Sequence, residues 1–439
     1  MGKAEDFPHA SVIEGVRFTA QVGVPNVIQG LFKKRELPTK VAGVARADLF
    51  AFTLVQGLVR KYGPGPFWVR VATDEALLLS DPADIEFVLG GSPDPFASDP
   101  PAKKAGMSAF QPDALTLSRG DLWRNRRDFA EAVLQTGRPL HSLALRMVKV
   151  AAQEAAGLDG EIGYDDLNTS FQRLTRRVVF GDAAADDTDL TALLGDLMAA
   201  GNKTPGKPAK GYDDLVARIA SYVETAEKGS LVSLVAAAPH DDATDVPGQL
   251  IHWLFAMGDT LPANLARALA VIGSHPEVRT EVYAELEGTV LTRAKEVAGL
   301  DYLGGVILEA MRLWPTTPLF GRVTTRDVTF PDGKVLPEGS QLLIHNLHNH
   351  RDRGRVEYAD RCAPGEWATG DAGSSWGFNF FSHGPQGCPG AGMSVFLGQA
   401  FLAALLTRAT PELVSPSLNP SKPLPYGLDL FAIRIKLTA

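Results

Sequence analysis

The sequence predicts a mainly α-helical protein with a small β region. Apolar residues recur at helical spacing over residues 49–62 and through several stretches of residues 140–228. A long apolar run over residues 246–278 has the composition of a buried helix. Residues 66–73 instead alternate loosely between apolar and polar side chains, as a strand does. Helices therefore dominate, and the strands are few and early in the chain.

Residues 76–90 are expected to continue the β region with a second strand and then a helix. The boundary between them is set by Asp81 and Pro82. Asp accepts hydrogen bonds from the free N–H groups at a helix start, and Pro suits the first helical position because it needs no donor there. Residues 91–118 follow as a long irregular segment rich in proline. A loop of this length in a compact domain is usually functional or mobile.

Composition excludes some classes of function. The chain has 439 residues, of which 45% are hydrophobic, so it has ample material for a core. A formal net charge of −8 argues against a nucleic-acid partner. The two cysteines, Cys362 and Cys388, form no CxxC pair and no zinc-like spacing with histidine. A disulfide between them stays open, but two cysteines suit a reducing compartment, and we expect a cytoplasmic protein.

No signal peptide or membrane anchor is expected at the N-terminus. The first ten residues carry acidic side chains and no apolar stretch. Residues 12–32 include Glu14, Arg17 and Pro25, so no run there is apolar enough to span a bilayer. We expect residues 1–48 to form a surface arm or a short amphipathic helix. The alternative is a membrane-surface role, helped by the basic residues 33–35.

The most informative stretch is the loop around Cys388. Glycines and prolines crowd residues 384–392, so neither strand nor helix is expected there, and an apolar helix follows directly. A thiol at a helix start lies near free N–H groups and the positive end of the helix dipole. We expect both to lower the pKa of Cys388 and to favour the thiolate, the form that binds a metal such as haem iron. A buried structural cysteine is the alternative that the loop alone leaves open.

The spacing of this loop resembles a known family. Phe381, Gly384, Cys388 and Gly390 fit the pattern F-x-x-G-x-x-x-C-x-G, which resembles the haem-binding loop of cytochrome P450. Upstream motifs occur in the order in which the family has them, and the resemblance extends from about residue 49 to the C-terminus. It implies the cytochrome P450 fold in one domain over residues 1–439, with the haem between a long distal helix and the cysteine loop. Cys388 is then the expected metal ligand of haem b (protohaem IX).

A Trp and an Arg upstream are expected to hold the haem propionates. Trp123 and Arg127 are four residues apart, so they share one helix face, and both can donate to a carboxylate. They resemble the family's W-x-x-x-R, and Arg322 matches its later propionate-binding Arg. A solvated basic helix with Trp123 in the core is the alternative. The arginines of residues 119–127 also suggest a docking site for an acidic redox partner of the ferredoxin type.

The long apolar run contains one polar gap. Asp259 and Thr260 are costly inside an apolar helix unless they have partners, and Pro262 is expected to kink the helix beside them. Residues 256–260 resemble the family's A-G-x-D-T, with Ala256 next to the haem and Met257 in place of Gly, so we expect the groove to be either narrower or shifted. The resemblance implies that Thr260 donates to dioxygen and that Asp259 relays protons. A transmembrane helix is the alternative, and Asp259 and Pro262 argue against it.

Two further motifs depart from the family. Glu309 and Arg312 resemble its E-x-x-R pair, but the third member, usually an Arg, is Glu366 here. Either Arg361 substitutes for it or the network is incomplete. In the cysteine loop, the family's basic residue two before the cysteine is Gln386, so one propionate loses a charged partner. His383 is the nearest candidate to compensate.

Substrate contacts are expected from two segments. Phe110 comes from the long irregular segment, which caps the substrate pocket in the family, and Thr317, Leu319 and Phe320 follow the E-x-x-R helix. The alternative for Phe110 is that it only pins its loop to the core. Residues 201–211 form a basic Gly/Pro connection where the family has a mobile lid.

The resemblance implies a haem–thiolate monooxygenase. We expect it to insert one oxygen atom from O2 into a small apolar or mixed organic substrate, with two electrons from a redox partner. A haem–thiolate enzyme that uses peroxide or rearranges its substrate is one alternative, and a haem-binding carrier or sensor without turnover is another. A helical binding module without haem is the third. The sequence does not name the substrate.

Overall fold

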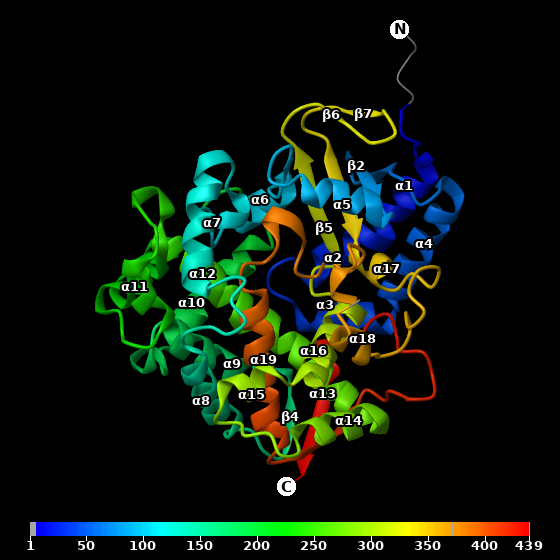
Figure 1. Ribbon diagram of the computed structural model, residues 1–439. Helices are drawn as coiled ribbons and strands as arrows, with labels where there is room; N and C mark the ends of the chain where they lie inside the picture. Colours follow the sequence, from blue (N-terminus) through cyan, green and yellow to red (C-terminus); the bar gives the residue numbers. More distant parts are fainter. Residues whose placement is uncertain (1–5, 371, 439) are drawn as a thin grey trace.

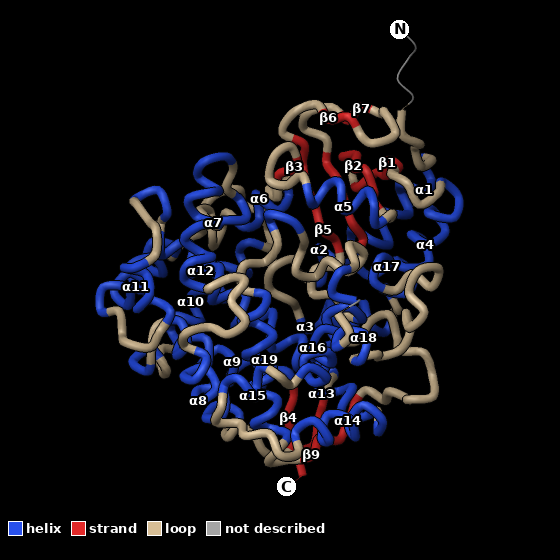
Figure 2. Tube along the Cα trace, viewed as in Figure 1, coloured by secondary structure: helices blue, strands red, loops and turns tan. Residues whose placement is uncertain are grey.

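The computed structural model describes residues 6–370 and 372–438, so the first five residues of the predicted arm lie outside the described part. Helices make up most of the molecule, and the strands gather in two places (Figures 1 and 2). The larger sheet lies at one end beside the N-terminal helices, and a smaller one lies near the C-terminus. The predicted class, mainly helical with a small β region, is confirmed.

The α-helices are α1 (Val12–Phe18), α2 (Val24–Gln29), α3 (Glu36–Val44), α4 (Ala47–Tyr62), α5 (Pro82–Gly90), α6 (Pro101–Met107), α7 (Gly120–Leu134), α8 (Ala144–Ala155), α9 (Tyr164–Val179), α10 (Thr188–Gly201), α11 (Tyr212–Thr225), α12 (Val246–Phe255), α13 (Leu261–Ser274), α14 (Pro276–Leu286), α15 (Ala294–Ala298), α16 (Asp301–Leu313), α17 (Asn346–His350), α18 (Gly365–Ala368) and α19 (Ala391–Leu406). Two π-helical segments, η1 (Thr19–Gly23) and η6 (Ala256–Thr260), interrupt this series.

The strands are β1 (Phe67–Val71), β2 (Asp74–Leu79), β3 (Phe96–Ala97), β4 (Glu161–Gly163), β5 (Leu319–Thr324), β6 (Val328–Thr329), β7 (Val335–Leu336), β8 (Gln341–His345), β9 (Thr410–Ser415) and β10 (Arg434–Thr438). The largest sheet has the order β1-β2-β8-β5-β3, with only β2 and β8 parallel. The predicted strand–strand–helix order over residues 66–90 is confirmed. Asp81 caps α5, because its carboxylate accepts from the Ala83 N–H at 2.8 Å. The irregular segment 91–118 is less irregular than expected, since it contains β3 and α6.

Three helices meet at Gly398, in the middle of the core. Leu265 of α13 and Ile307 of α16 approach α19 so closely that a Cβ on Gly398 would lie 3.1 Å and 2.8 Å from their side-chain carbons. A larger side chain would therefore force these helices apart. Most of α19 is buried, and it also packs on α8. This packing fixes the helix that begins just after Cys388.

The expected break near Pro262 takes the form of a π-helical segment. Helix α12 passes into η6, and α13 then begins with Pro262 in its first turn, where no N–H donor is required. The Leu261 N–H donates to the Ala256 carbonyl, five residues back. The helix thus widens in this turn, and the proline does not cost it its backbone hydrogen bonds. Asp259 and Thr260 lie in the widened turn.

The N-terminal arm is a set of short helices that pack on the larger sheet. A Cβ on Gly15 would lie 2.9 Å from the Cβ of Arg70 in β1, so α1 and β1 are in close contact. Many of the arm's apolar side chains are exposed. Among the described residues, no single helix has the length and apolar composition to cross a membrane. The pair α3 and α4, bent by 59°, passes that test only together.

Residues 30–33 bring the arm into contact with α6 and α10. Asn202 at the end of α10 accepts from the Phe32 N–H at 2.9 Å and donates to the Lys33 carbonyl at 2.8 Å. The Phe32 ring lies against Gly106 of α6 and 5.4 Å from the ring of Phe110. The arm is therefore fixed at the junction between α6 and α10.

A buried ion pair with an unexpected third member lies under α16. Glu309 and Arg312 are both 0% exposed and pair through Arg312 Nε and Glu309 Oε1 at 2.5 Å. The Trp367 indole N–H donates to Glu309 Oε1 at 2.8 Å, and the Ala363 N–H donates to Oε2 at 2.7 Å. Arg361 contributes its carbonyl to Arg312, not its guanidinium. Neither expected outcome for this network holds, since Trp367 completes it with a neutral donor.

We expect Trp367→Phe to lower the free energy of unfolding by about 1–3 kcal/mol, because a buried carboxylate loses a donor. Chemical denaturation measures this. The matched control is Trp376→Phe, since Trp376 is partly buried and its ring lies 4.8 Å from that of His383, tilted by 43°, without contacting the pair. Equal losses in both variants would contradict the role of the Trp367 N–H.

Candidate functional site

The Cys388 loop is fixed by its own backbone and by α5. The Cys388 N–H donates to the Phe381 carbonyl at 2.8 Å, which closes the loop around a short turn at residues 384–386. Gly384 has φ +66°, and a Cβ there would lie 2.4 Å from the Leu89 carbonyl oxygen. Only glycine fits such a backbone conformation and such a contact. The loop therefore lies directly on the end of α5.

Helix α7 supports the loop from the other side. Arg127 Nη1 donates to the Gly387 carbonyl at 2.6 Å, and its Nε donates to Glu131 at 2.6 Å. Thr136, just beyond α7, donates to the Pro389 carbonyl at 2.7 Å. Arg127 is thus in contact with the residue next to Cys388. Trp123 is half-buried on the same helix, four residues earlier, and packs against the main core.

The Cys388 thiol is free and accessible, although protein atoms surround it. The side chain is exposed and forms no disulfide with Cys362. Desolvation raises the pKa of the Cys388 thiol, while the Gly390 N–H and the charge of Arg127 lower it by less. The prediction that the pKa of Cys388 is lowered is therefore wrong, because desolvation by the surrounding protein atoms outweighs the effect of the helix start. Metal coordination deprotonates a thiol regardless of this balance.

Arg322 is a buried cation without a carboxylate partner. Its guanidinium donates to Ser92 Oγ at 3.1 Å, to the Gly321 carbonyl at 2.9 Å and to Ser382 Oγ at 3.2 Å. Desolvation lowers the pKa of Arg322 to about 9, and no acid in the described chain offsets this. A buried charge with only neutral partners is costly unless an anion joins it. Ser382 connects this cation to the cysteine loop.

The remaining predicted residues of the loop have local roles. His383 contacts the Phe378 carbonyl through Nε2 at 2.8 Å, and its ring packs in a tilted arrangement against Trp376. Its ring is thus engaged within the loop. Gly390 is the N-cap of α19, and Phe381 packs edge-on against Phe380 at 5.3 Å.

The Asp259–Thr260 pair lies in η6 and is partly exposed. Asn168 of α9 donates to the Gly258 carbonyl at 2.8 Å and lies 3.5 Å from Asp259 Oδ1. Burial raises the pKa of the Asp259 carboxyl. Among the described residues the Thr260 hydroxyl has no hydrogen-bond partner, although the Thr260 carbonyl accepts from Asn264 at 3.0 Å. Thr260 therefore does not satisfy its hydroxyl on a helix carbonyl.

Met257 packs into the protein core beside this pair. Its side chain is 3% exposed and belongs to the main core. The close approach in this turn is at Gly258, where a Cβ would lie 2.6 Å from the Gln172 side chain. Ala256, one residue before Met257, is half-buried at the start of η6.

Phe110 is in contact with the distal helix, whereas Thr317 lies at the surface. The Phe110 ring is buried and lies 5.7 Å from Phe255, the last residue of α12. Leu319 and Phe320 are partly exposed in β5, and the Arg322 guanidinium lies 4.4 Å from the Phe320 ring. Thr317 is exposed, and its carbonyl accepts from Asn346.

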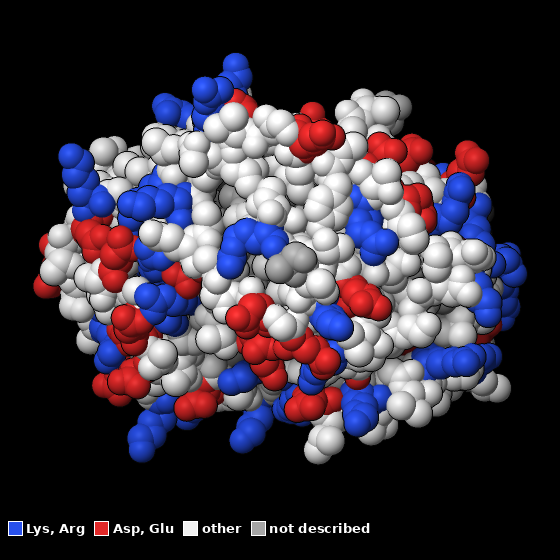
Figure 3. All heavy atoms as spheres, turned by 90° about the horizontal axis from the view of Figure 1, so that it is seen from below, with Lys and Arg blue, Asp and Glu red and all other residues white. Residues whose placement is uncertain are grey.

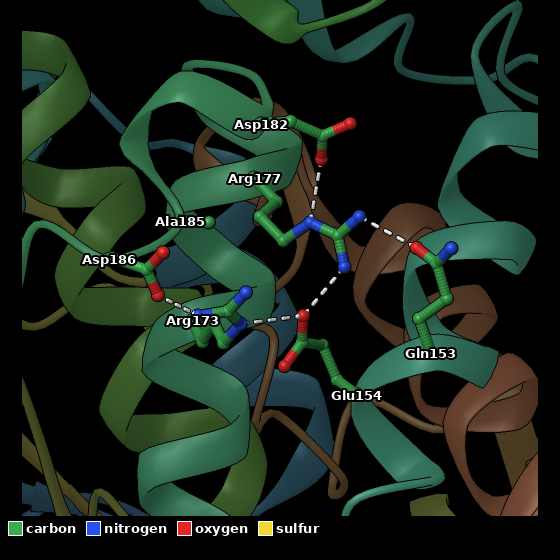
Figure 4. A pocket seen from close by; sticks show the side chains of 7 residues that line it. All are labelled: Gln153, Glu154, Arg173, Arg177, Asp182, Ala185 and Asp186. Atoms are coloured by element: carbon green, nitrogen blue, oxygen red, sulfur yellow. Dashed lines mark hydrogen bonds and ion pairs between the residues drawn. The ribbon is translucent and has the colours of Figure 1, made fainter.

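A cavity of about 410 Å³ elsewhere is lined by paired charges (Figure 4). Arg177 donates to Glu154 at 2.6 Å and to Asp182 at 2.7 Å, and Arg173 joins Glu154 to Asp186. Every guanidinium and carboxylate drawn there has a partner. The cluster fastens α8 to α9 and leaves no charge free for a ligand.

Comparisons with known proteins agree on one family. The profile described as "Cytochrome P450" matches residues 240–427. Over these residues the chain matches the cytochrome P450 family. It is 28% identical over 182 residues to the cyclooctat-9-en-7-ol 5-monooxygenase of Streptomyces melanosporofaciens, covering 37% of this chain and 39% of that protein. It is 30% identical over 210 residues to the cytochrome P450 monooxygenase sphH of Aspergillus fumigatus, covering 44% and 38%. The chain thus spans about two fifths of these curated P450 relatives.

The fold likeness extends over most of the chain. The structure titled "Retinoic acid bound cyanobacterial CYP120A1" superposes with a TM-score of 0.69 at 17% identity, covering 87% of this chain and 93% of that one. The family's cofactor is protohaem IX, whose iron is bound by a cysteine thiolate. Arg322 fits this group, because its unbalanced buried charge matches a propionate carboxylate. Cys388, accessible in its braced loop, has the donor chemistry that the iron requires.

Arg126, the neighbour of Arg127 in α7, is not a suitable control for a test of Arg127. Arg126 is 6% exposed and donates to Ser118 at 2.9 Å and to Asp113 at 3.2 Å, so its loss would damage the fold. Arg124 is exposed and pairs only with Asp121, one turn away. It carries the same side chain without a structural role.

We expect Arg127→Leu to speed haem loss to apomyoglobin about tenfold relative to Arg124→Leu. The variant loses a charge beside Cys388 and the bond to the Gly387 carbonyl. Equal rates of haem loss in the two variants would remove Arg127 from the haem site.

Proposed function

We propose that this P450 is a haem–thiolate monooxygenase. It inserts one oxygen atom from O2 into a small apolar or mixed organic substrate and takes two electrons from a redox partner. The observation that carries the proposal is the accessible, unpaired Cys388 thiol in a loop fastened to α5 and α7. Its family relatives include proteins named as monooxygenases. When bound, the haem supplies the activation of dioxygen, and the thiolate supports cleavage of the O–O bond.

Thr260 and Asp259 are proposed to supply the protons. The Thr260 hydroxyl is free of helix carbonyls, so it can donate to a ligand in the distal pocket. The raised pKa of Asp259 makes its carboxyl a proton donor as well as an acceptor. Asn168 holds the backbone of this turn through the Gly258 carbonyl, and this bond orients the pair. Asp259 therefore relays a proton, and Thr260 holds it at its Oγ.

The substrate is proposed to contact Phe110, Phe320 and Leu319. Phe110 packs on Phe255 immediately before η6, which gives the pocket an aromatic wall next to Thr260. Apolar walls exclude water and suit an apolar substrate. Thr317 is the weakest of the four predicted contacts, because its side chain is exposed beyond the start of β5.

The basis for a ferredoxin-type partner at residues 119–127 is smaller than the sequence suggests. Of the four arginines, Arg126 and Arg127 are only 6% and 11% exposed. The exposed ones are Arg119 and Arg124, and both are paired with acids. At the other end of the molecule, which Figure 3 shows from below, Lys and Arg are also interspersed with Asp and Glu. We therefore propose that a redox partner docks at α7, and that the surface there selects neither an acidic nor a basic partner. We also propose a cytoplasmic location, because the two cysteines form no disulfide.

We expect the reduced protein with carbon monoxide to show the red-shifted Soret band of thiolate ligation. Cys388→Ser should abolish that band, because an alcohol does not replace a thiolate as the iron ligand. Cys362→Ser is the matched control and should keep it. A band that survives Cys388→Ser, or that disappears in Cys362→Ser instead, would overturn the ligand assignment.

We expect Thr260→Ala to keep the haem spectrum and the affinity for a spectrum-shifting substrate but to uncouple turnover. Reductant is then consumed and peroxide is released in place of oxidised product, because the hydroxyl that holds the proton is gone. Peroxide released per reductant oxidised measures this, and it should rise several-fold over wild type and over Thr260→Ser. An unchanged ratio together with lower stability would assign Thr260 a structural role. Turnover with peroxide alone, unaffected by this variant, would favour the peroxide-using alternative.

A further inference from the structure

A second cation, which is partly buried, lies close to Arg322. Lys103, on α6, donates from Nζ to the Ser98 carbonyl at 2.8 Å and lies 3.4 Å from the Thr116 carbonyl. Desolvation, together with the charge of Arg322, lowers the pKa of its ammonium to about 7. Both cations thus lie in one desolvated region, and both bond only to neutral oxygens.

The nearest acid is already engaged. Asp99 attracts Lys103 from a distance, but its two carboxylate oxygens accept from Arg119 Nε at 2.8 Å and 3.0 Å. Neither Lys103 nor Arg322 has an ion-pair partner within the described ranges 6–370 and 372–438. A buried guanidinium and a partly buried ammonium, both without an acid partner, call for negative charge from a ligand.

Lys103 is connected to the cysteine loop at the position where the loop lacks a cation. Gln386, two residues before Cys388, donates from Nε2 to Ser98 Oγ at 3.1 Å, and Lys103 donates to the carbonyl of that same serine. Gln386 Oε1 is buried and has no partner in the described part of the chain. The loop, α6 and β5 lie side by side in Figure 1, and Arg322 reaches the loop at Ser382. The lysine therefore adjoins the neutral side chain of the loop.

We propose that Lys103 binds a haem propionate and supplies the positive charge that Gln386 does not. Together with Arg322 it balances the two propionates, so the charge missing from the loop comes from α6 instead. This inference rests on the proposed haem–thiolate function. A substrate carboxylate is the other anion that Lys103 suits, but the links through Ser98 and Ser382 connect both cations to the cysteine loop. The haem is therefore the better match.

Haem transfer to apomyoglobin tests the proposal on the reconstituted full-length protein. Lys103→Met should lose haem at least about tenfold faster than wild type, because a buried charge pair is broken. Lys104→Met is the matched control, since Lys104 is the exposed neighbour on the same helix, and it should match wild type. Adding Gln386→Arg to Lys103→Met should restore slow loss, because the charge returns from the loop.

Reconstitution with protohaem dimethyl ester separates a charge contact from a structural role. The ester has no carboxylates, so wild type and Lys103→Met should lose it at the same rate. A tenfold difference that persists with the ester would overturn the proposal, since Lys103 would then only support α6. Equal loss of ordinary haem would also overturn it. If Lys103→Met weakened the binding of a carboxylated ligand but left the rate of haem loss unchanged, Lys103 would bind the substrate and not the haem.

The proposed function fails in a different way. A protein that takes up no haem, or that shows no thiolate band, overturns the haem–thiolate assignment and the Lys103 contact together. A thiolate band with equal haem loss in wild type and Lys103→Met overturns the Lys103 contact alone.

Discussion

The buried pair of Glu309 and Arg312 is the interaction on which the haem side of the molecule depends. Arg312 bonds the carbonyls of residues 350, 358, 359 and 361, and so holds a long irregular segment against α16. His350 continues the path: it contacts the Arg312 carbonyl through Nδ1 and accepts from the Asn379 N–H through Nε2. Burial lowers the pKa of His350 to about 3, so it stays neutral and keeps both bonds. Asn379 leads directly into the Cys388 loop.

Two arginines on this side of the protein, Arg312 and Arg322, are both buried but differ in whether an acid balances their charge. At Glu309 a carboxylate, a guanidinium, an indole and a backbone N–H satisfy one another, so the cluster is closed and serves only the fold. At Arg322 the charge is equally buried, but its partners are two serines and a carbonyl. A closed network stabilises by itself, whereas an unbalanced one is complete only with a ligand. The balance of charge therefore separates the structural arginine from the binding one.

Sequence reasoning located what depends on short spacing. The loop pattern around Cys388, the Asp81 cap, the pair at Glu309 and Arg312 and the break at residues 256–260 all follow from neighbours a few positions apart. It missed what depends on distant segments. Trp367 lies 58 residues from Glu309 and Ser92 lies 230 residues from Arg322, so no local pattern reveals these bonds. The pKa of Cys388 was assigned in the wrong direction for the same reason, because desolvation comes from tertiary packing.

The contacts of Phe32 with Asn202 and α6 have a consequence for the order in which the chain folds. The Phe32 N–H donates to the side chain of Asn202, which lies 170 residues later in the chain, and the phenyl ring also packs against α6. On the ribosome, the arm therefore emerges long before the surface that receives it exists. Contacts between such distant segments form late, because the intervening chain must first be ordered. We therefore expect docking of the arm to be a late step of folding, which follows the formation of α6 and α10.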